Sequence, residues 1–261
     1  MTHPDRYDPS LLYAIPRAPG RAALDPAAVQ IMQGADFWTA FEVSWLGSRG
    51  MPRVAVAEIA IPCASPSIVE SKSLKLYLNS LNDTRFASPE AVAAQIRADI
   101  SACCGAPAEV SLRRLDDCVR EGVRQPAGEC LDAIELDEPG FAPDAGCLTA
   151  DPGTRVEEVL YSDLLKTNCP VTGQPDWATV IVDYRGPRLD RAGLLAYLVS
   201  FRHHSDFHEH CVERMFADLW CRLRPERLSL TARYTRRGGI DINPWRTSAP
   251  GEPPRGRLAR Q

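Results

Sequence analysis

Alternating apolar and polar residues predict β-strands in several parts of the chain. Residues 37–46 are rich in aromatic and β-branched side chains, and residues 52–61 alternate along their length. The turn-forming residues Ser48, Arg49 and Gly50 separate these two stretches, which predicts an antiparallel hairpin. Further strands are predicted at 110–115, 178–185, 228–234 and 240–245.

Apolar residues that recur every three to four positions predict three helices. The first begins with Ser88 as its N-cap and Pro89 in its first turn, and Gly105 ends it. A second helix follows Asp190 and carries its apolar residues on one face up to position 201. A third, strongly amphipathic helix is predicted at 206–223, with Ser205 and Asp206 as the capping pair.

The order of these elements is similar in the two halves of the chain: strands, then helix, then strand. We therefore expect two copies of one α+β unit. The predicted parts are an N-terminal arm at 1–35, a first module at 36–150 that ends in an acidic linker rich in Pro and Gly, a second module at 151–247, and a disordered tail at 248–261.

Composition places the chain among soluble globular proteins. It has 261 residues, 44% hydrophobic and 25% charged, with a formal net charge of −4. This charge does not favour binding to nucleic acid or to an anionic membrane. The N-terminal sequence lacks the apolar run of a secretory signal, and no stretch approaches a membrane span. We therefore expect a cytoplasmic protein whose nine cysteines are reduced.

The segment 167–177, T-N-C-P-V-T-G-Q-P-D-W, is the first candidate for chemistry. Its Asn, Pro and Gly residues predict a loop, so Cys169 can approach a substrate. Asp176, seven residues later, can transfer a proton to or from the group that the cysteine attacks. The alternative is that Cys169 is an ordinary cysteine in a turn.

Glu70, Ser71, Lys72 and Ser73 form a second candidate. They stand directly before three leucines at positions 74, 76 and 78, so the carboxylate and hydroxyls can cap a helix. The same carboxylate, hydroxyls and ammonium group can also bind a polar ligand and a phosphate. Sequence alone leaves both interpretations open.

Four of the five histidines lie within residues 203–210. His204, His208 and Cys211 could bind zinc if all three were helical. A second interpretation uses Glu209 as a buried carboxylate that accepts hydrogen bonds from a purine-like ring, with His208 beside it. A third is a polar helix start that lies in solvent.

Three long segments together resemble the family of NADPH-dependent 7-cyano-7-deazaguanine reductases, the nitrile reductases of queuosine biosynthesis. They are N-C-P-V-T-G-Q-P-D-W at 168–177, L-L-A-Y-L-V-S-F-R-H-H-S-D-F-H-E-H-C-V-E-R at 194–214 and R-Y-T-R-R-G-G-I-D-I-N-P-W-R at 233–246. In addition, V-E-S-K-S-L-K-L-Y-L-N-S at 69–80 resembles the signature motif of the family. The resemblance implies the long form, with two tandem tunnelling-fold (T-fold) units: antiparallel sheets with helices packed on one face.

The resemblance also implies a mechanism and a set of substrate contacts. Cys169 would attack the nitrile carbon to give a covalent thioimide, and Asp176 would transfer the proton. Two hydrides from two NADPH molecules would then give the aminomethyl product. The substrate-binding residues implied are Val69, Glu70, Ser71, His208 and Glu209.

The cofactor contacts implied are Ser71, Lys72, Arg237 and Gly238, and the two cations suit the 2′-phosphate of NADPH. The chain has no G-x-G-x-x-G, so a Rossmann mode of binding is not expected, and no metal is implied. T-fold sites usually form between subunits, which implies a homodimer or a higher homo-oligomer. One departure is Pro170, which stands where relatives have an aliphatic residue and removes a backbone N–H.

Two functions of other classes remain open at this point. One is a zinc-dependent purine or pterin hydrolase of the same superfamily, which would use the histidines between His203 and His210. The other is a purine-binding module without catalytic activity.

Overall fold

The computed structural model describes residues 6–253 and 256–261. The chain divides into two compact units. The first contains residues 35–123 with the segments up to 19 and 236–242, and the second contains 20–34, 124–235 and 243–261. Each unit has antiparallel strands and helices, which confirms the predicted α+β class with two tandem units.

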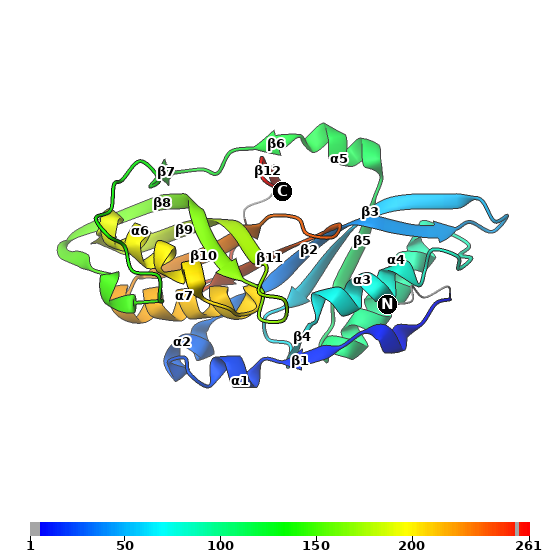
Figure 1. Cartoon of the computed structure of the whole chain (residues 1–261), viewed down its shortest axis with the longest axis horizontal. Helices are drawn as coiled ribbons and strands as arrows, with labels where there is room; N and C mark the ends of the chain where they lie inside the picture. The colour runs from blue at the N-terminus through cyan, green and yellow to red at the C-terminus, as the bar shows by residue number, and fades with distance from the viewer. Residues whose placement is uncertain (1–5, 254–255) are drawn as a thin grey trace. The chain divides into compact units, whose positions relative to one another are not determined.

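The first unit is built on three antiparallel strands in the order β5-β3-β2. Their bounds are β2 Gln33–Leu46, β3 Pro52–Pro62 and β5 Glu109–Arg113. The helices α3 (Ser71–Asn79) and α4 (Pro89–Cys104) lie against one face of these strands (Figure 1). Side chains from both helices join Trp38 and Ile59 in a single hydrophobic core.

Local sequence signals set the ends of α4, as predicted. The Ser88 hydroxyl accepts a hydrogen bond from the N–H of Ala91, and Pro89 occupies the first turn. Gly105 ends the helix in the left-handed region at φ 74°, where a residue with a side chain would be strained. The three residues Val92, Ile96 and Ile100 are fully buried, which confirms the predicted apolar face.

The second unit has the strand order β11-β10-β9-β8-β7. Its long central pair, β8 (Ala150–Asn168) and β9 (Pro175–Leu189), is a hairpin closed by residues 169–174. The other strands are β7 Glu129–Cys130, β10 Arg227–Tyr234 and β11 Ile240–Thr247. All pair antiparallel except β7, which runs parallel to β8.

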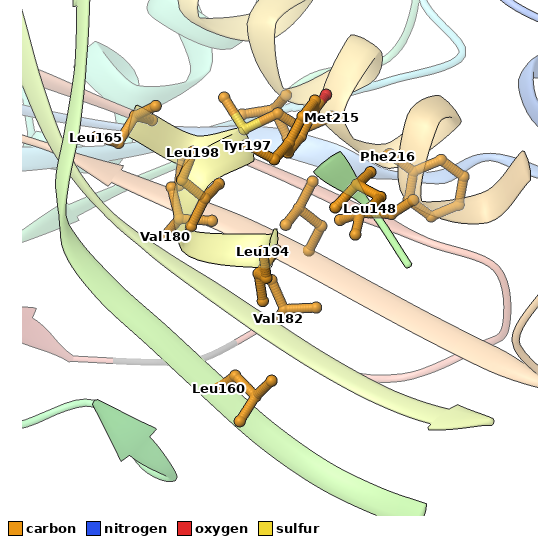
Figure 2. Packing of buried hydrophobic residues seen from close by; sticks show 14 of the residues in the cluster. Leu148, Leu160, Leu165, Val180, Val182, Leu194, Tyr197, Leu198, Met215 and Phe216 are labelled. Atoms are coloured by element: carbon orange, nitrogen blue, oxygen red, sulfur yellow. The ribbon is translucent and has the colours of Figure 1, made fainter. Parts of the chain in front are cut away.

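Two helices, α6 (Arg191–Ser200) and α7 (His208–Leu223), cover one face of this sheet (Figure 1). Figure 2 shows the core between them: Val180 and Val182 of β9 point toward Leu194 and Leu198 of α6. Met215 and Phe216 bring the apolar face of α7 into the same cluster. Because side chains alternate along a strand, the odd-numbered residues of β9 lie on the opposite face.

The remaining elements are short. They are η1 Pro9–Leu11, β1 Ala14–Pro16, α1 Ala18–Arg21, α2 Pro26–Ile31, β4 Ser67–Val69, α5 Leu115–Glu121, β6 Val123–Arg124, η2 Ala145–Cys147, η3 Phe201–His203 and β12 Arg257–Leu258. Within the described residues, no helix has both the length and the apolar character that crossing a membrane requires.

The division between the units differs from the predicted boundary at position 150. The polar segment after Arg124 belongs to the second unit, because Leu131 and Leu148 are buried in its hydrophobic core. The predicted arm differs as well. Its residues form helices and strands, Ala28 is fully buried, and Arg17 forms a buried ion pair with Asp36.

The predicted disorder of the tail also differs from the structure over residues 256–261. Leu258 and Gln261 in this segment are 8% and 5% exposed. The amide of Gln261 donates to the carbonyl of Tyr234 and to the side chain of Asn243. Composition had suggested a solvated segment, but tertiary hydrogen bonds hold it on the second unit.

Candidate active site

The hairpin loop between β8 and β9 carries Cys169 in its first position. The N–H of Cys169 donates to the carbonyl of Gln174 over 2.9 Å, and the N–H of Gly173 donates to the carbonyl of Cys169 over 2.9 Å. Gly173 has φ 69°, a conformation that favours glycine. Cys169 lies between the end of β8 and the start of β9, which confirms its predicted loop position, and it is half-buried.

Asp176 stands on β9 directly across from Thr167 of β8. Its side chain is 6% exposed and faces the same side of the sheet as the helices. The Nε2 atom of His208, the first residue of α7, lies 3.3 Å from the Oδ2 atom of Asp176. The structure therefore brings a carboxylate and an imidazole together within two strand residues of the cysteine loop.

Tyr234, the last residue of β10, packs against the flat face of the His208 ring. Its ring stacks on His208 with 3.7 Å between the ring centres and 7° between the planes. Tyr234 is fully buried, and burial raises the pKa of its hydroxyl well above the ordinary value. The tyrosine is thus a neutral support that leaves His208 little rotational freedom.

The segment before α7 pairs with the end of β8. The N–H of Asn168 donates to the carbonyl of His204 over 2.8 Å, and the N–H of Asp206 donates to the carbonyl of Asn168 over 3.2 Å. These two bonds hold residues 204–206 beside the residue that precedes Cys169. As a result, the start of α7 and the cysteine loop form one connected assembly in the second unit.

The predicted cap of α7 was wrong in its position. The N-cap is Phe207, not Ser205 or Asp206, and it makes no capping hydrogen bond through its side chain. The Asp206 carboxylate instead accepts from the N–H of Phe207 and lies 3.1 Å from Nδ1 of His210. Burial opposes the charge on His210, but Asp206 and two nearby glutamates raise the pKa of this histidine above its ordinary value.

Glu209 lies in the first turn of α7 and is 2% exposed. A carboxylate at a helix N-terminus interacts favourably with the helix dipole. Glu209 and His208 are consecutive and stand within the same turn as the Asp176 contact. A buried carboxylate in this place is suited to hydrogen-bond a ring that presents several N–H donors.

The predicted zinc alternative is not supported by the geometry. His204 is the extended residue after η3, whereas His208 begins α7, so the two are not on one helical face. Cys211 is fully buried in the core, and burial raises the pKa of its thiol well above the ordinary value. Within residues 6–253 and 256–261, no three His, Cys, Asp or Glu side chains are arranged to hold a metal ion.

In the first unit, the segment 69–73 adopts the helix-cap arrangement that the sequence allowed. The Glu70 carboxylate accepts hydrogen bonds from the N–H groups of Lys72 and Ser73, at 3.0 and 2.7 Å. The Val69 side chain is buried in the core, so only its backbone could contact a ligand. The predicted ligand contacts of Val69, Glu70 and Ser71 stay predictions.

Two lysines of α3, Lys72 and Lys75, lie in the same unit as the loop at 236–239. A Cβ atom on Gly238 would lie 2.9 Å from Nζ of Lys75, so the end of this α3 side chain reaches the loop at 238. Lys72 is exposed on the first turn, and the neighbouring Arg236 lies 3.8 Å above the Phe41 ring. The structure thus brings Gly238 close to the ammonium group of Lys75, one turn after Ser71 and Lys72.

The sequence analysis did not identify Tyr234 or Thr167 as parts of the site. Tyr234 was predicted only as a strand residue, and no local signal indicates that a tyrosine will stack on a histidine 26 positions away. Thr167 lies across from Asp176 only because of the β8–β9 register. A hairpin prediction from the turn residues 172–175 could have found this second contact.

Comparisons with known proteins match both units. The family described as "Nitrile reductase, 7-cyano-7-deazaguanine-reductase N-term" matches residues 3–112, and the family described as "QueF-like protein" matches residues 175–252. The first range includes Glu70 and Lys72, and the second includes Asp176, His208 and Glu209.

Several relatives match over nearly the whole chain. The NADPH-dependent 7-cyano-7-deazaguanine reductase of Stenotrophomonas maltophilia (strain K279a) is 55% identical over 252 residues, 95% of this chain and 90% of the relative. The proteins of the same name from Polaromonas sp. and Desulfotalea psychrophila are 52% and 49% identical. These two alignments cover 98% and 99% of this chain and 94% of each relative.

Proposed function

Because the chain belongs to the family of NADPH-dependent 7-cyano-7-deazaguanine reductases, we propose that it reduces the nitrile of 7-cyano-7-deazaguanine to the aminomethyl group. The reaction consumes two NADPH and two protons for each nitrile, and its product serves queuosine formation in tRNA. The proposal is supported by the arrangement of Cys169, Asp176 and His208 around one hairpin, since these groups supply a nucleophile and a proton path.

Cys169 is the nucleophile of the proposed reaction. Its sulfur attacks the nitrile carbon, a C–S bond forms, and one π-bond of the C≡N group becomes the new N–H bond of a thioimide. The proton that leaves the thiol passes through Asp176 to the nitrogen, so the step is balanced without another reactant. The half-buried position of Cys169 allows this approach, and the two backbone hydrogen bonds of its loop limit its movement.

In the second unit, His208 supports the proton path and Glu209 binds the substrate ring. The His208 Nε2 atom lies 3.3 Å from Asp176. The imidazole can therefore stabilise the Asp176 carboxylate before this carboxylate accepts the thiol proton and again after it has passed that proton to the nitrogen. The Tyr234 ring holds the imidazole in this orientation. The buried Glu209 accepts hydrogen bonds from the N–H groups of the deazaguanine ring and so positions the nitrile.

The residues of the first unit fit NADPH. Ser71 and Lys72 begin α3, and the end of the Lys75 side chain of this helix reaches Gly238, which follows Arg237. Gly238 has φ 61°, a backbone conformation that favours glycine, and the end of the Lys75 side chain lies beside it. When bound, NADPH supplies hydride to the substrate carbon. Lys72 and Arg237 would hold its 2′-phosphate.

The stoichiometry of NADPH oxidation tests the function. We expect two NADPH to be oxidised for each 7-cyano-7-deazaguanine added, with the aminomethyl compound as the product identified by mass spectrometry. Protein treated with a chelator should retain full activity, since no step requires a metal. Hydrolysis of a purine or pterin without NADPH oxidation would contradict the proposal.

Replacement of Lys72 by alanine tests the cofactor contact. Loss of one cation at the 2′-phosphate should raise the KM for NADPH about tenfold, leave kcat within about twofold, and reduce the preference for NADPH over NADH. The matched control is Arg49→Ala, which removes an exposed cation from the β2–β3 turn of the same unit. An equal effect of the two variants would show that only the general charge of the unit matters.

We also propose that the protein is a cytoplasmic homodimer. The resemblance to T-fold enzymes supports the assembly, because their sites usually form between subunits. Light scattering on the purified chain measures the mass directly, and a monomer with full activity would contradict this assembly.

A further inference from the structure

We propose that the segment 256–261, called here the 256–261 clamp, positions the active-site residues of the second unit through Arg260 and Gln261. The inference rests on the proposed function, because it assigns positioning residues to that same reaction. Neither side chain faces α7, the helix that carries His208 and Glu209. Both contact strands of the sheet on the face opposite to α7.

Gln261 is hydrogen-bonded to the end of β10 and to β11. Its Nε2 atom donates to the carbonyl of Tyr234 over 3.2 Å and to Oδ1 of Asn243 over 2.6 Å. Its Oε1 atom accepts from Nε of Arg233 over 3.0 Å. Another nitrogen of the Arg233 guanidinium donates to the carbonyl of Gly256 over 2.8 Å, so the segment is held at both ends.

Arg260 hydrogen-bonds to β8 and lies close to a ring on β9. Its guanidinium donates to the carbonyl of Asp163 on β8 over 2.7 Å and lies 5.7 Å from the ring centre of Trp177 on β9. The carbonyl of Trp177 in turn accepts from the N–H of Thr235, the residue after Tyr234. The clamp therefore contacts β8, β9, β10 and β11 at the end of the sheet where Asn168, Asp176 and Tyr234 lie.

The contacts of the clamp are adjacent to catalytic groups but on the opposite face. Trp177 follows Asp176, and side chains of consecutive strand residues point to opposite faces. Tyr234 is bonded to the clamp through its backbone, while its ring stacks on His208. A shift of the β10 end would therefore move the tyrosine ring, and with it the imidazole that lies 3.3 Å from Asp176.

Burial supports a specific role for the Gln261 amide. The residue is 5% exposed, and both ends of its amide have partners of the correct type. A buried amide whose donors and acceptor are all hydrogen-bonded is held in one orientation. A side chain that only covered apolar surface would not need an amide group. Gln261 is therefore assigned as a positioning residue, not as a group that touches substrate.

The test compares Gln261→Met with the wild type. Methionine keeps the length and bulk of glutamine and removes its donors. The first readout is the NMR signal of the His208 ring protons, identified by its absence in His208→Asn. Stacking on Tyr234 should shift this signal upfield by ring current in the wild type, and Gln261→Met should move it downfield toward its position in Tyr234→Leu.

The second readout is the rate of thioimide formation at saturating nitrile without NADPH. We expect a fall of about tenfold in Gln261→Met, as for the loss of about 1.4 kcal/mol, with little change in the nitrile concentration that gives half the maximal rate. The matched control is Gln125→Met, since Gln125 is an exposed glutamine of the same unit that also donates to a tyrosine. This control should retain the wild-type rate and the wild-type His208 signal.

The two readouts separate the clamp from the function. An unchanged His208 signal and an unchanged rate in folded Gln261→Met would overturn the clamp. Absence of a thioimide in the wild type would overturn the proposed mechanism, while a shifted His208 signal would still support the clamp. If Gln261→Met does not fold, Gln261→Glu replaces it, because a carboxylate keeps the bond from Arg233 and removes both amide donors.

Discussion

Replacement of Cys169 by alanine is expected to abolish both the covalent adduct and NADPH oxidation. The proposed reaction has no other group that can form the bond to the nitrile carbon, so the loss of kcat should reach about 10⁴-fold or more. Intact-protein mass spectrometry after addition of 7-cyano-7-deazaguanine should show the mass of one thioimide per chain in the wild type only. Because Cys169 is half-buried in a loop, the variant should still fold.

The control for this experiment is Cys221→Ala. Cys221 is an exposed cysteine on α7, in the same unit as Cys169. It should keep the adduct and the full rate of NADPH oxidation. An adduct that persists in Cys169→Ala would reject this cysteine as the nucleophile, and its loss in Cys221→Ala would show that general thiol chemistry had been measured.

Replacement of Glu213 by alanine is expected to cause a large loss of stability. Glu213, on α7, is 1% exposed and accepts hydrogen bonds from Arg21 and Arg246. Arg246 is fully buried, so removal of this carboxylate would leave two guanidinium groups close together without the charge that they share. Loss of one partner of a buried ion pair costs about 3–5 kcal/mol, which urea unfolding followed by tryptophan fluorescence should detect.

The matched control is Glu157→Ala in the same unit. Glu157 also pairs with an arginine, Arg227, but its side chain is 62% exposed. Exposed pairs contribute about 0–1 kcal/mol, so this variant should unfold at almost the wild-type urea concentration. Similar losses in the two variants would contradict the role of burial in the Arg21–Glu213–Arg246 cluster.

Gly20, next to this cluster, shows why residues 20–34 belong to the second unit. A Cβ atom on Gly20 would lie 2.8 Å from the His210 ring, so the backbone passes directly over α7. Arg21 then reaches Glu213 on the same helix through two hydrogen bonds. The sequence indicated an extended arm because proline and alanine dominate the local pattern, and no local pattern reveals a contact 192 positions away.

The elements with strong local signals were predicted well. The helix after Ser88, the helix after Asp190 and the hairpin around Gly50 all depend on capping residues, turn residues and apolar repeats within a few positions. The cap of α7 was misplaced by one to two residues, because Asp206 hydrogen-bonds to His210 as well as to its own neighbour. The capping signal of Asp206 competes there with the hydrogen bond from this carboxylate to His210 on the first turn of α7.

The choice of the candidate site residues rests on local signals of the same kind. Cys169, Asp176, His208 and Glu209 all lie in segments with a recognisable order of residues, so the sequence was sufficient to select them. The contact between Asp176 and His208 joins residues 32 positions apart in sequence. It depends on the β8–β9 register and on the pairing of residues 204–206 with Asn168.

By itself, the sequence determined the α+β class, the tandem units, the family resemblance and the loop that carries Cys169, because these depend on local patterns and on residue identity. Only the tertiary structure decided that Tyr234 supports His208, that residues 124–150 pack on the second unit, and that Gln261 is bonded behind the site. Those contacts arise when strands far apart in sequence become neighbours, since burial then requires each polar group to find a partner.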